Sequence, residues 1–358
     1  FGSSAYVGGV TAMQVAGLHN IRLPGGLWAD KWNWSYVATG PDAWMVDVFE
    51  ILQNITDYGS GAEPQCIVNF SGAWREVPGG TEVMHSRTET VQLAADWVTY
   101  MNVTNGYDVK WWEVGNEIFG GWHPHQVSGT VYGGEFADFN SDMKAVDPGI
   151  NVGAVTAIEP AYWTWSQNMM AATLAKGVVP DFLVVHHYKD NDILGQSVND
   201  AAEFTGLLDG WVSAIYGPAY VGQIRYFMTE FRTRGQYGSA GDNRYRNSFM
   251  DAMFTVQYLL ELAAHGWVGA NIWSNKLTYN AGPPITDYGL VERYTNDPYA
   301  TWYMYPFLTS FLGRQMVRTT DDMGDTVRAY GTLDASGDLV LAVINNSETL
   351  AQSITVNV

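Results

Sequence analysis

The chain has 358 residues, a formal net charge of −19 and a pI near 4.5. This acidity argues against nucleic acid, anionic membranes and polyanionic substrates, all of which would be repelled. Apolar residues make up 47%, so a large core can form without disulfides, and the single cysteine, Cys66, lies in an apolar run typical of a buried structural thiol.

Short β-like runs alternate with longer helical patterns along most of the chain. Most of the runs are apolar and several are rich in Val and Ile, as buried parallel strands are. Eight strands alternating with eight helices is the count of a (β/α)₈ TIM barrel. A first strand is expected near Phe1, followed by strands at Leu18 to Leu23, Gln65 to Phe70, Val109 to Gly115, Ile150 to Thr156, Phe182 to His186, Ile224 to Thr229 and Trp267 to Trp273.

The helical patterns between these runs are amphipathic. The alternative fold, a doubly wound open sheet, would normally carry a Gly-rich phosphate turn after an early strand, and Val7-Gly8-Gly9 is not that motif. The expected helices are Val10 to Gly17, Pro41 to Tyr58, Thr88 to Met101, Glu135 to Val146, Tyr162 to Lys176, Asp200 to Ile215, Phe249 to Ala264 and Tyr299 to Leu312.

The pattern changes near residue 314, which divides a catalytic barrel at 1–313 from a small antiparallel β region at 314–358. Strands are expected at Thr326 to Tyr330, Leu339 to Ile344 and Ile354 to Val358, with a hairpin turn between Asp334 and Asp338. These strands are too few for a complete sandwich. The region therefore either packs on the barrel or borrows strands from outside this chain.

Two of the strand-like runs lead into a glutamate. The first glutamate follows the fourth expected strand, in the run Trp111-Trp112-Glu113-Val114-Gly115-Asn116-Glu117. The second ends the seventh, in the run Tyr226-Phe227-Met228-Thr229-Glu230. The carboxyl ends of the strands form the active face of a β/α barrel. Two carboxylates at that face are the minimum equipment for hydrolysing a glycosidic bond. The sequence therefore predicts a glycoside hydrolase.

The Asn-Glu pair after the fourth strand and the Glu after the seventh resemble glycoside hydrolase clan A, whose members are retaining enzymes on TIM barrels. The resemblance covers about Leu18 to Leu312. It implies that Glu117 is the general acid/base and Glu230 the nucleophile. The acid must stay protonated near neutral pH, so we expect the pKa of Glu117 to be raised. Glu230 must stay ionised, which calls for donors around it.

The same resemblance assigns roles to neighbouring residues. Asn116 would hydrogen-bond the sugar 2-hydroxyl, and Arg22 would sit beside the nucleophile and keep it charged. Trp273 would form an aromatic floor under the reacting sugar. In His186-His187-Tyr188, His186 would line the subsite and Tyr188 would bond the nucleophile, while alternation directs His187 outward.

Two other groups receive a structural interpretation. Glu113 lies on the same strand face as Glu117, where many clan members carry a buried structural acid. His123-Pro124-His125 has metal-like spacing but no convincing further ligands, so it is expected in a loop lining the cleft. No metal or cofactor is predicted.

Tryptophans at or after strand ends suggest several sugar subsites, because sugar rings stack on aromatic planes. Trp28 and Trp122 are predicted substrate contacts, and about half of the set is expected to be structural. The full set is Trp28, Trp32, Trp34, Trp74, Trp122, Trp163, Trp165 and Trp273, whereas Trp44, Trp97, Trp211 and Trp302 fall in helical patterns and are expected in the core.

The turn Arg22-Leu23-Pro24-Gly25-Gly26, followed by Trp28, Asp30 and Trp34, resembles the arabinofuranosidase, β-xylosidase and related endoglucanase families. Met228-Thr229-Glu230-Phe231-Arg232 instead resembles a Thr-Glu-Phe ending of several endoglycanase families. We therefore expect an endo-β-glycanase that cuts a neutral β-1,4-glucan or xylan. The alternatives are an exo-acting α-L-arabinofuranosidase or β-xylosidase, and a non-catalytic carbohydrate-binding barrel.

The expected partner is a poly- or oligosaccharide, with neither nucleic acid nor membrane. A secreted or extracellular location is expected.

Overall fold

The computed structural model describes most of the expected barrel and part of the C-terminal region. The described residues are 20–35, 63–76, 80–189, 199–233, 248–274, 278–279, 286–287, 289–291, 297–309, 315–317, 319, 326–334, 336–347 and 349–355.

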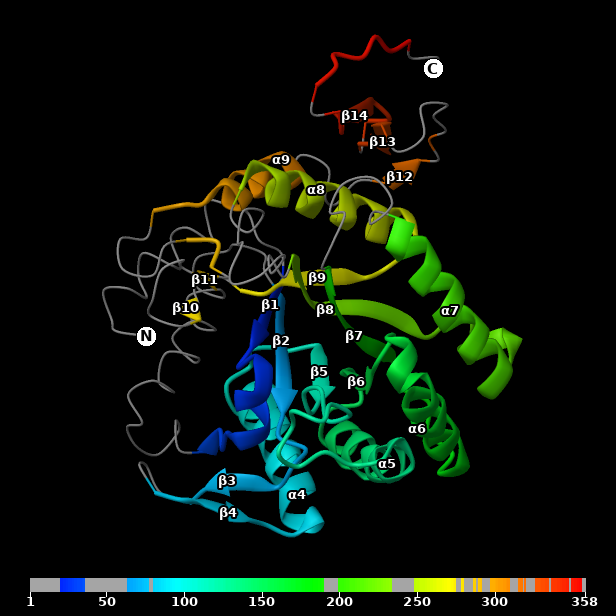
Figure 1. The fold of residues 1–358 in the computed structure, drawn as a ribbon. Helices are drawn as coiled ribbons and strands as arrows, with labels where there is room; N and C mark the ends of the chain where they lie inside the picture. The colour runs from blue at the N-terminus through cyan, green and yellow to red at the C-terminus, as the bar shows by residue number, and fades with distance from the viewer. Residues whose placement is uncertain are drawn as a thin grey trace.

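A seven-stranded parallel sheet forms the centre of the molecule, and its spatial order, β1-β2-β5-β6-β7-β8-β9, follows the chain (Figure 1). The sheet curls until its two edges approach, and Asn271 Nδ2 on β9 donates to Asn20 Oδ1 on β1 at 2.5 Å. This is a nearly closed barrel. The strands are β1 (Asn20–Leu23), β2 (Glu63–Val68), β5 (Trp111–Val114), β6 (Asn151–Thr156), β7 (Phe182–Lys189), β8 (Arg225–Thr233) and β9 (Gly269–Ile272).

The seven expected strands from Leu18 onward are confirmed, and the first, near Phe1, lies outside the described residues. The main difference concerns the ends of β7 and β8, which continue three residues beyond His186 and Glu230. The register shifts between these strands, so that Val185 pairs with Met228 but His186 pairs with Glu230. Thr229 is the extra residue of this β-bulge, a device often found next to active sites.

Helices cover the outer face of the barrel (Figure 1). The expected helices at 10–17 and 41–58 lie outside the described residues. One start is predicted wrongly: α5 begins at Gly129, not Glu135, because the Ser128 side chain caps it by accepting from the Val131 N–H. The helices are α4 (Arg87–Val98), α5 (Gly129–Val146), α6 (Trp163–Ala175), α7 (Asp200–Ile215), α8 (Phe249–Ala264) and α9 (Met304–Thr309).

Short elements complete the described fold. They are the 3-10 helices η1 (Gly26–Lys31), η3 (Pro160–Tyr162), η5 (Pro218–Tyr220) and η6 (Ala300–Tyr303), the π-helix η2 (Thr99–Thr104), and the two-stranded pairs β3 (Ala73–Arg75) with β4 (Glu82–Met84) and β10 (Thr278–Tyr279) with β11 (Thr286–Asp287).

The C-terminal β region is a three-stranded antiparallel sheet of β12 (Gln315–Val317), β13 (Val327–Leu333) and β14 (Leu339–Asn345). It packs on the barrel, because Tyr330 and Ile344 join Val256 of α8 in one buried cluster. Residues 354–355 are not in a strand, so that part of the third expected strand is wrong. The third strand of this sheet is instead the short β12, which precedes the other two in the chain.

No helix among the described residues is both long and apolar enough to cross a membrane.

Glycines let α5 and α6 approach closely. A Cβ at Gly133 would lie 2.2 Å from the backbone oxygen of Met169, and one at Gly129 would lie 1.9 Å from that of Trp165. Gly134, next to Gly133 on the same helix, has no atom within 4 Å of its Cβ position. The two neighbouring glycines therefore differ in their surroundings: Gly133 faces the backbone of α6, and Gly134 faces open space.

We predict that Gly133→Ala destabilises the protein by about 1–3 kcal/mol, because the helices must move apart. Gly134→Ala should instead stabilise it by up to about 1 kcal/mol through helix propensity. Urea unfolding of the two variants measures the difference. Equal free energies of unfolding would show that the close approach of α5 and α6 does not matter.

Candidate active site

A buried arginine holds the centre of the site. Arg22, near the end of β1, donates from Nε and Nη2 to the two carboxylate oxygens of Glu113, at 2.8 Å each. Its Nη1 donates to Glu230 Oε1 at 2.6 Å. Only 4% of the Arg22 side chain is exposed. Burial acts to lower the pKa of Arg22, but the charges of Glu113 and Glu230 outweigh it and raise the pKa, so the cation is secure.

Both carboxylate oxygens of Glu113 bind Arg22. Both of its oxygens accept from the guanidinium, and Oε1 also accepts from Gln65 Nε2 at 2.6 Å. The residue is completely buried. This is the structural arrangement expected for an acid at this position.

Glu230 receives donors on both oxygens. Tyr188 Oη donates to Oε2 at 2.8 Å, opposite the Arg22 bond to Oε1. The β-bulge at Thr229 places Glu230 beside His186 on the neighbouring strand. Two donors favour the charged form of a carboxylate, which is what a nucleophile requires.

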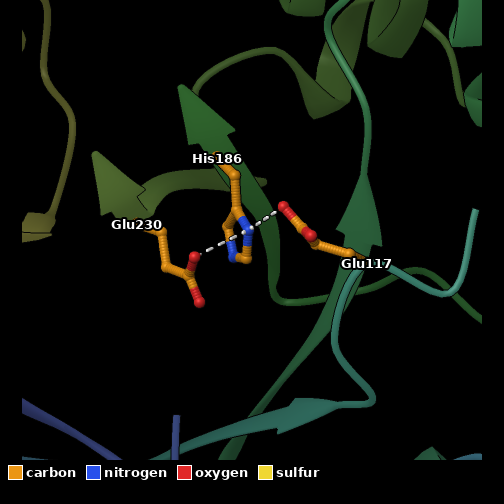
Figure 2. Close-up of side chains that lie close together, drawn as sticks. All are labelled: Glu117, His186 and Glu230. Atoms are coloured by element: carbon orange, nitrogen blue, oxygen red, sulfur yellow. Dashed lines mark hydrogen bonds and ion pairs between the residues drawn. The ribbon is translucent and has the colours of Figure 1, made fainter. Parts of the chain in front are cut away.

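Glu117 lies in the turn after β5 with a φ of 46°, a left-handed conformation uncommon outside glycine. Its Oε1 lies 2.9 Å from His186 Nδ1, and its Oε2 accepts from Trp122 Nε1 at 2.8 Å. His186 Nδ1 also lies 3.5 Å from Glu230 Oε2. Figure 2 shows the imidazole between the two carboxylates.

The carboxylates of Glu117 and Glu230 are close. One oxygen of each, together with a ring nitrogen of His186, lies within 4.8 Å of the others. Retaining glycosidases separate their carboxyl groups by about 5–5.5 Å and inverting ones by about 6.5–9.5 Å. An oxygen pair within 4.8 Å is closer to the retaining separation than to the inverting one.

Glu117 and His186 shift each other's pKa. Burial acts to raise the pKa of Glu117, but the hydrogen bond and charge of His186 outweigh it and hold the pKa below its ordinary value. Burial acts to lower the pKa of His186, yet the charge of Glu230 and the bond to Glu117 raise it. The expectation of a raised pKa at Glu117 is therefore wrong, because the hydrogen bond and charge of His186 outweigh the effect of burial.

The predicted substrate contacts are only partly gathered at this centre. Asn116 Oδ1 accepts from Arg22 Nη2 at 2.9 Å, so it lies beside the guanidinium that also binds Glu230. The Trp273 ring lies against the turn after β1, where a Cβ on Gly26 would approach it to 2.7 Å. This contact explains the glycines of that turn. Trp28 is exposed in η1.

His187 points away from the centre, as alternation along β7 predicts. Its Nε2 lies 3.1 Å from Asp200 Oδ2 at the start of α7, and its ring packs on Phe204 and Tyr258.

Several of the strand-end tryptophans are buried and so cannot line a long binding cleft. Trp32, Trp34 and Trp74 are buried, whereas Trp28, Trp122 and Trp163 are exposed. Trp165 packs against Phe119 and donates to the Val127 carbonyl. Of the tryptophans expected in the core, Trp97 and Trp211 are buried, Trp302 is partly buried, and Trp44 lies outside the described residues.

Asp30 and His123 make buried contacts at the site that the sequence did not predict. Asp30 entered only through resemblance, yet it is fully buried and bonds the Asn116 backbone N–H at 2.7 Å. His123 bonds Asp30 and is buried, so His123-Pro124-His125 does not simply line a cleft. The contact partners of these residues are distant in sequence, and no local pattern reveals them.

Within the described part of the chain, one set of metal-type ligands comes together, and it is Glu117, His186 and Glu230. All three are engaged with one another, and Arg22 and Tyr188 also bond Glu230. A guanidinium 2.6 Å from Glu230 already supplies positive charge there. These contacts suit a pair of catalytic carboxylates better than a bound metal ion.

Comparison with known proteins identifies glycosidases. No family model matches the chain. It is 22% identical over 223 residues to an exo-α-(1→6)-L-arabinofuranosidase of Bifidobacterium longum, covering 56% of this chain and 41% of that protein. It is 30% identical over 140 residues to α-L-arabinofuranosidase C of Emericella nidulans, covering 32% and 28%. The chain thus spans less than half the length of these relatives.

Solved structures share the fold over nearly the whole chain. An α-L-arabinofuranosidase from Thermotoga maritima superposes with a TM-score of 0.70 at 18% identity, covering 94% of this chain and 74% of that one. A monomeric β-xylosidase from Caulobacter crescentus gives 0.66 at 16% identity, covering 93% and 70%. The predicted resemblance to glycoside hydrolase clan A is confirmed. Glycosidases are the proteins that this chain is similar to, both in sequence and in fold.

We predict that Glu230→Gln lowers the pKa of His186, because the negative charge of Glu230 is the largest influence raising it. The ring should then lose its proton at a lower pH than in the wild type. NMR titration of the histidine ring signals measures this, with the other six rings as internal references. An unchanged midpoint would show that Glu230 does not control the proton on His186.

Proposed function

We propose that this protein is a retaining glycoside hydrolase with Glu230 as nucleophile and Glu117 as general acid/base. The observation that supports it is the pair of nearby carboxylates with different contacts: Glu230 bonds Arg22 and Tyr188, whereas Glu117 bonds His186 and Trp122. One environment suits a charged nucleophile and the other a group that exchanges a proton.

In the first step, Glu230 attacks the anomeric carbon as the glycosidic bond breaks, and a proton from Glu117 passes to the leaving oxygen. The Glu117–His186 pair supplies that proton. In the second step, Glu117 accepts a proton from water, which attacks the anomeric carbon and releases Glu230.

The charge of Glu230 helps to time these transfers. While Glu230 is ionised, it raises the pKa of His186 and so keeps a proton on the pair. In the glycosyl ester that charge is gone. The pair then holds its proton less firmly in the step in which Glu117 acts as a base.

For the substrate, we propose a terminal α-L-arabinofuranosyl unit, removed in exo fashion. Both curated relatives are arabinofuranosidases by name, and one is named as exo-acting. The burial of Trp32, Trp34 and Trp74 removes three of the eight tryptophans that suggested a long row of subsites. Trp122 contacts the acid/base, so we place it on the leaving-group side, where its exposed ring can stack on the next sugar. This exo activity replaces the expected endo-β-glycanase as our first choice.

An exo-enzyme should release arabinose from the start of an arabinan digest while viscosity stays nearly unchanged. Aryl α-L-arabinofuranoside should be hydrolysed with retention, and soluble β-glucan and xylan should be poor substrates. Product chromatography and viscometry together decide this. An early collapse of viscosity on β-glucan or xylan would restore the endo-β-glycanase.

Glu117→Ala should slow substrates with poor leaving groups by about 10²–10⁴-fold, because they require protonation. Activated aryl glycosides should lose far less, and azide should restore activity by forming a glycosyl azide of retained configuration. Glu230→Ala should lose activity on both kinds of substrate, whereas Glu203→Ala, an exposed carboxylate on α7, serves as the control. Retained-configuration rescue of Glu230→Ala instead would reverse the two roles.

A further inference from the structure

Asp30 is a buried carboxylate that joins three segments of the active face. It lies in η1 after β1 and none of its surface is exposed. Its Oδ1 accepts from the backbone N–H groups of Phe70 and Ser71, at 2.8 and 3.1 Å, just beyond β2. Its Oδ2 accepts from the backbone N–H of Asn116 at 2.7 Å, just beyond β5. One side chain thus fixes the ends of three strands relative to one another.

His123 supplies the fourth contact. Its Nε2 lies 3.2 Å from Asp30 Oδ2, and both side chains are fully buried. The backbone N–H of His125 donates to His123 Nδ1 at 3.1 Å. Because Nδ1 is an acceptor, the ring proton sits on Nε2 and points at Asp30. The His-Pro-His motif therefore sets a tautomer that donates to a carboxylate.

The backbone that Asp30 holds leads directly into Glu117. Asn116 is fixed at its N–H by Asp30 and at its side chain by Arg22. The preceding residue, Gly115, has a φ of 78°, and a Cβ there would lie 2.8 Å from Cβ of Phe70. The next residue, Glu117, then turns in its left-handed conformation toward His186.

We propose that Asp30 and His123 form a positioning pair that sets the backbone at Asn116 and thereby orients the acid/base Glu117. This rests on the function proposed above. A carboxylate is required because all four groups facing Asp30 are donors. An asparagine offers one oxygen, so its amide would face two N–H groups and leave both without an acceptor.

A buried pair that only stabilised the fold would behave differently. Its loss would lower the amount of folded protein and reduce turnover of all substrates alike. A misdirected Glu117 instead impairs proton donation, which matters most for poor leaving groups. The dependence of kcat on the leaving group therefore separates the two roles.

Four variants test the pair. Asp30→Asn replaces one of the two acceptor oxygens by an amide NH2 with little change of shape. His123→Leu removes the donor, and His123→Gln keeps an N–H near the position of Nε2. His125→Ala is the matched control, because alanine keeps the backbone N–H that bonds His123. Circular dichroism and thermal melting first establish that each variant is folded.

Each variant is assayed on a dinitrophenyl and on an alkyl α-L-arabinofuranoside. Asp30→Asn should lose about 100-fold in kcat on the alkyl glycoside, the scale of a misplacement of about 1 Å, and less than about 10-fold on the dinitrophenyl glycoside. His123→Leu should show the same asymmetry more weakly, while His123→Gln and His125→Ala stay near the wild type. Equal losses on both substrates, or equal behaviour of His123→Leu and His123→Gln, would overturn the inference.

Hydrogen exchange provides a readout that needs no activity. In Asp30→Asn and His123→Leu, amides in 114–118 should exchange faster than in the wild type, while His123→Gln keeps the wild-type rate. Unchanged exchange in both variants overturns the inference whatever the enzyme does. A wild type that hydrolyses no glycoside defeats the proposed function, and the exchange rates then still decide whether Asp30 and His123 hold this segment.

Discussion

The buried guanidinium of Arg22 is the interaction on which the candidate site depends. It is shared between Glu113, which binds it through both oxygens, and Glu230, which binds it through one. Removing one member of a buried ion pair leaves an uncompensated charge and costs about 3–5 kcal/mol. Glu113 therefore anchors the cation, so that Arg22 can present one N–H to Glu230 and another to Asn116.

Further hydrogen bonds hold the residues around the two carboxylates in place. Asp30 fixes the backbone of Asn116, Tyr188 fixes Glu230, and His186 links Glu230 to Glu117. These contacts come from several barrel strands, and each of them joins two residues far apart in the sequence. The barrel converts separate strand ends into one rigid arrangement, which a two-step displacement needs because both carboxylates must stay aligned with one carbon.

The β-bulge in β8 shows how a small irregularity serves this arrangement. Without the register shift at this bulge, His186 would pair with Thr229 rather than with Glu230. A shift of one residue along a strand turns a side chain to the opposite face. The sequence Met228-Thr229-Glu230 gives no local sign of this bulge, because bulge formation depends on the neighbouring strands β7 and β9.

The amino-acid sequence by itself determined the parallel strands, most of the helices, and the two strand-end glutamates, because periodicity and strand ends are local properties. It also identified Arg22, Asn116, His186 and Tyr188 through resemblance. Tertiary structure alone decided that His186 lowers the pKa of Glu117, that three of the eight strand-end tryptophans are buried, and that Asp30 and His123 support Asn116. These outcomes depend on burial and on distances between residues far apart in the chain, and no pattern of neighbouring residues encodes either.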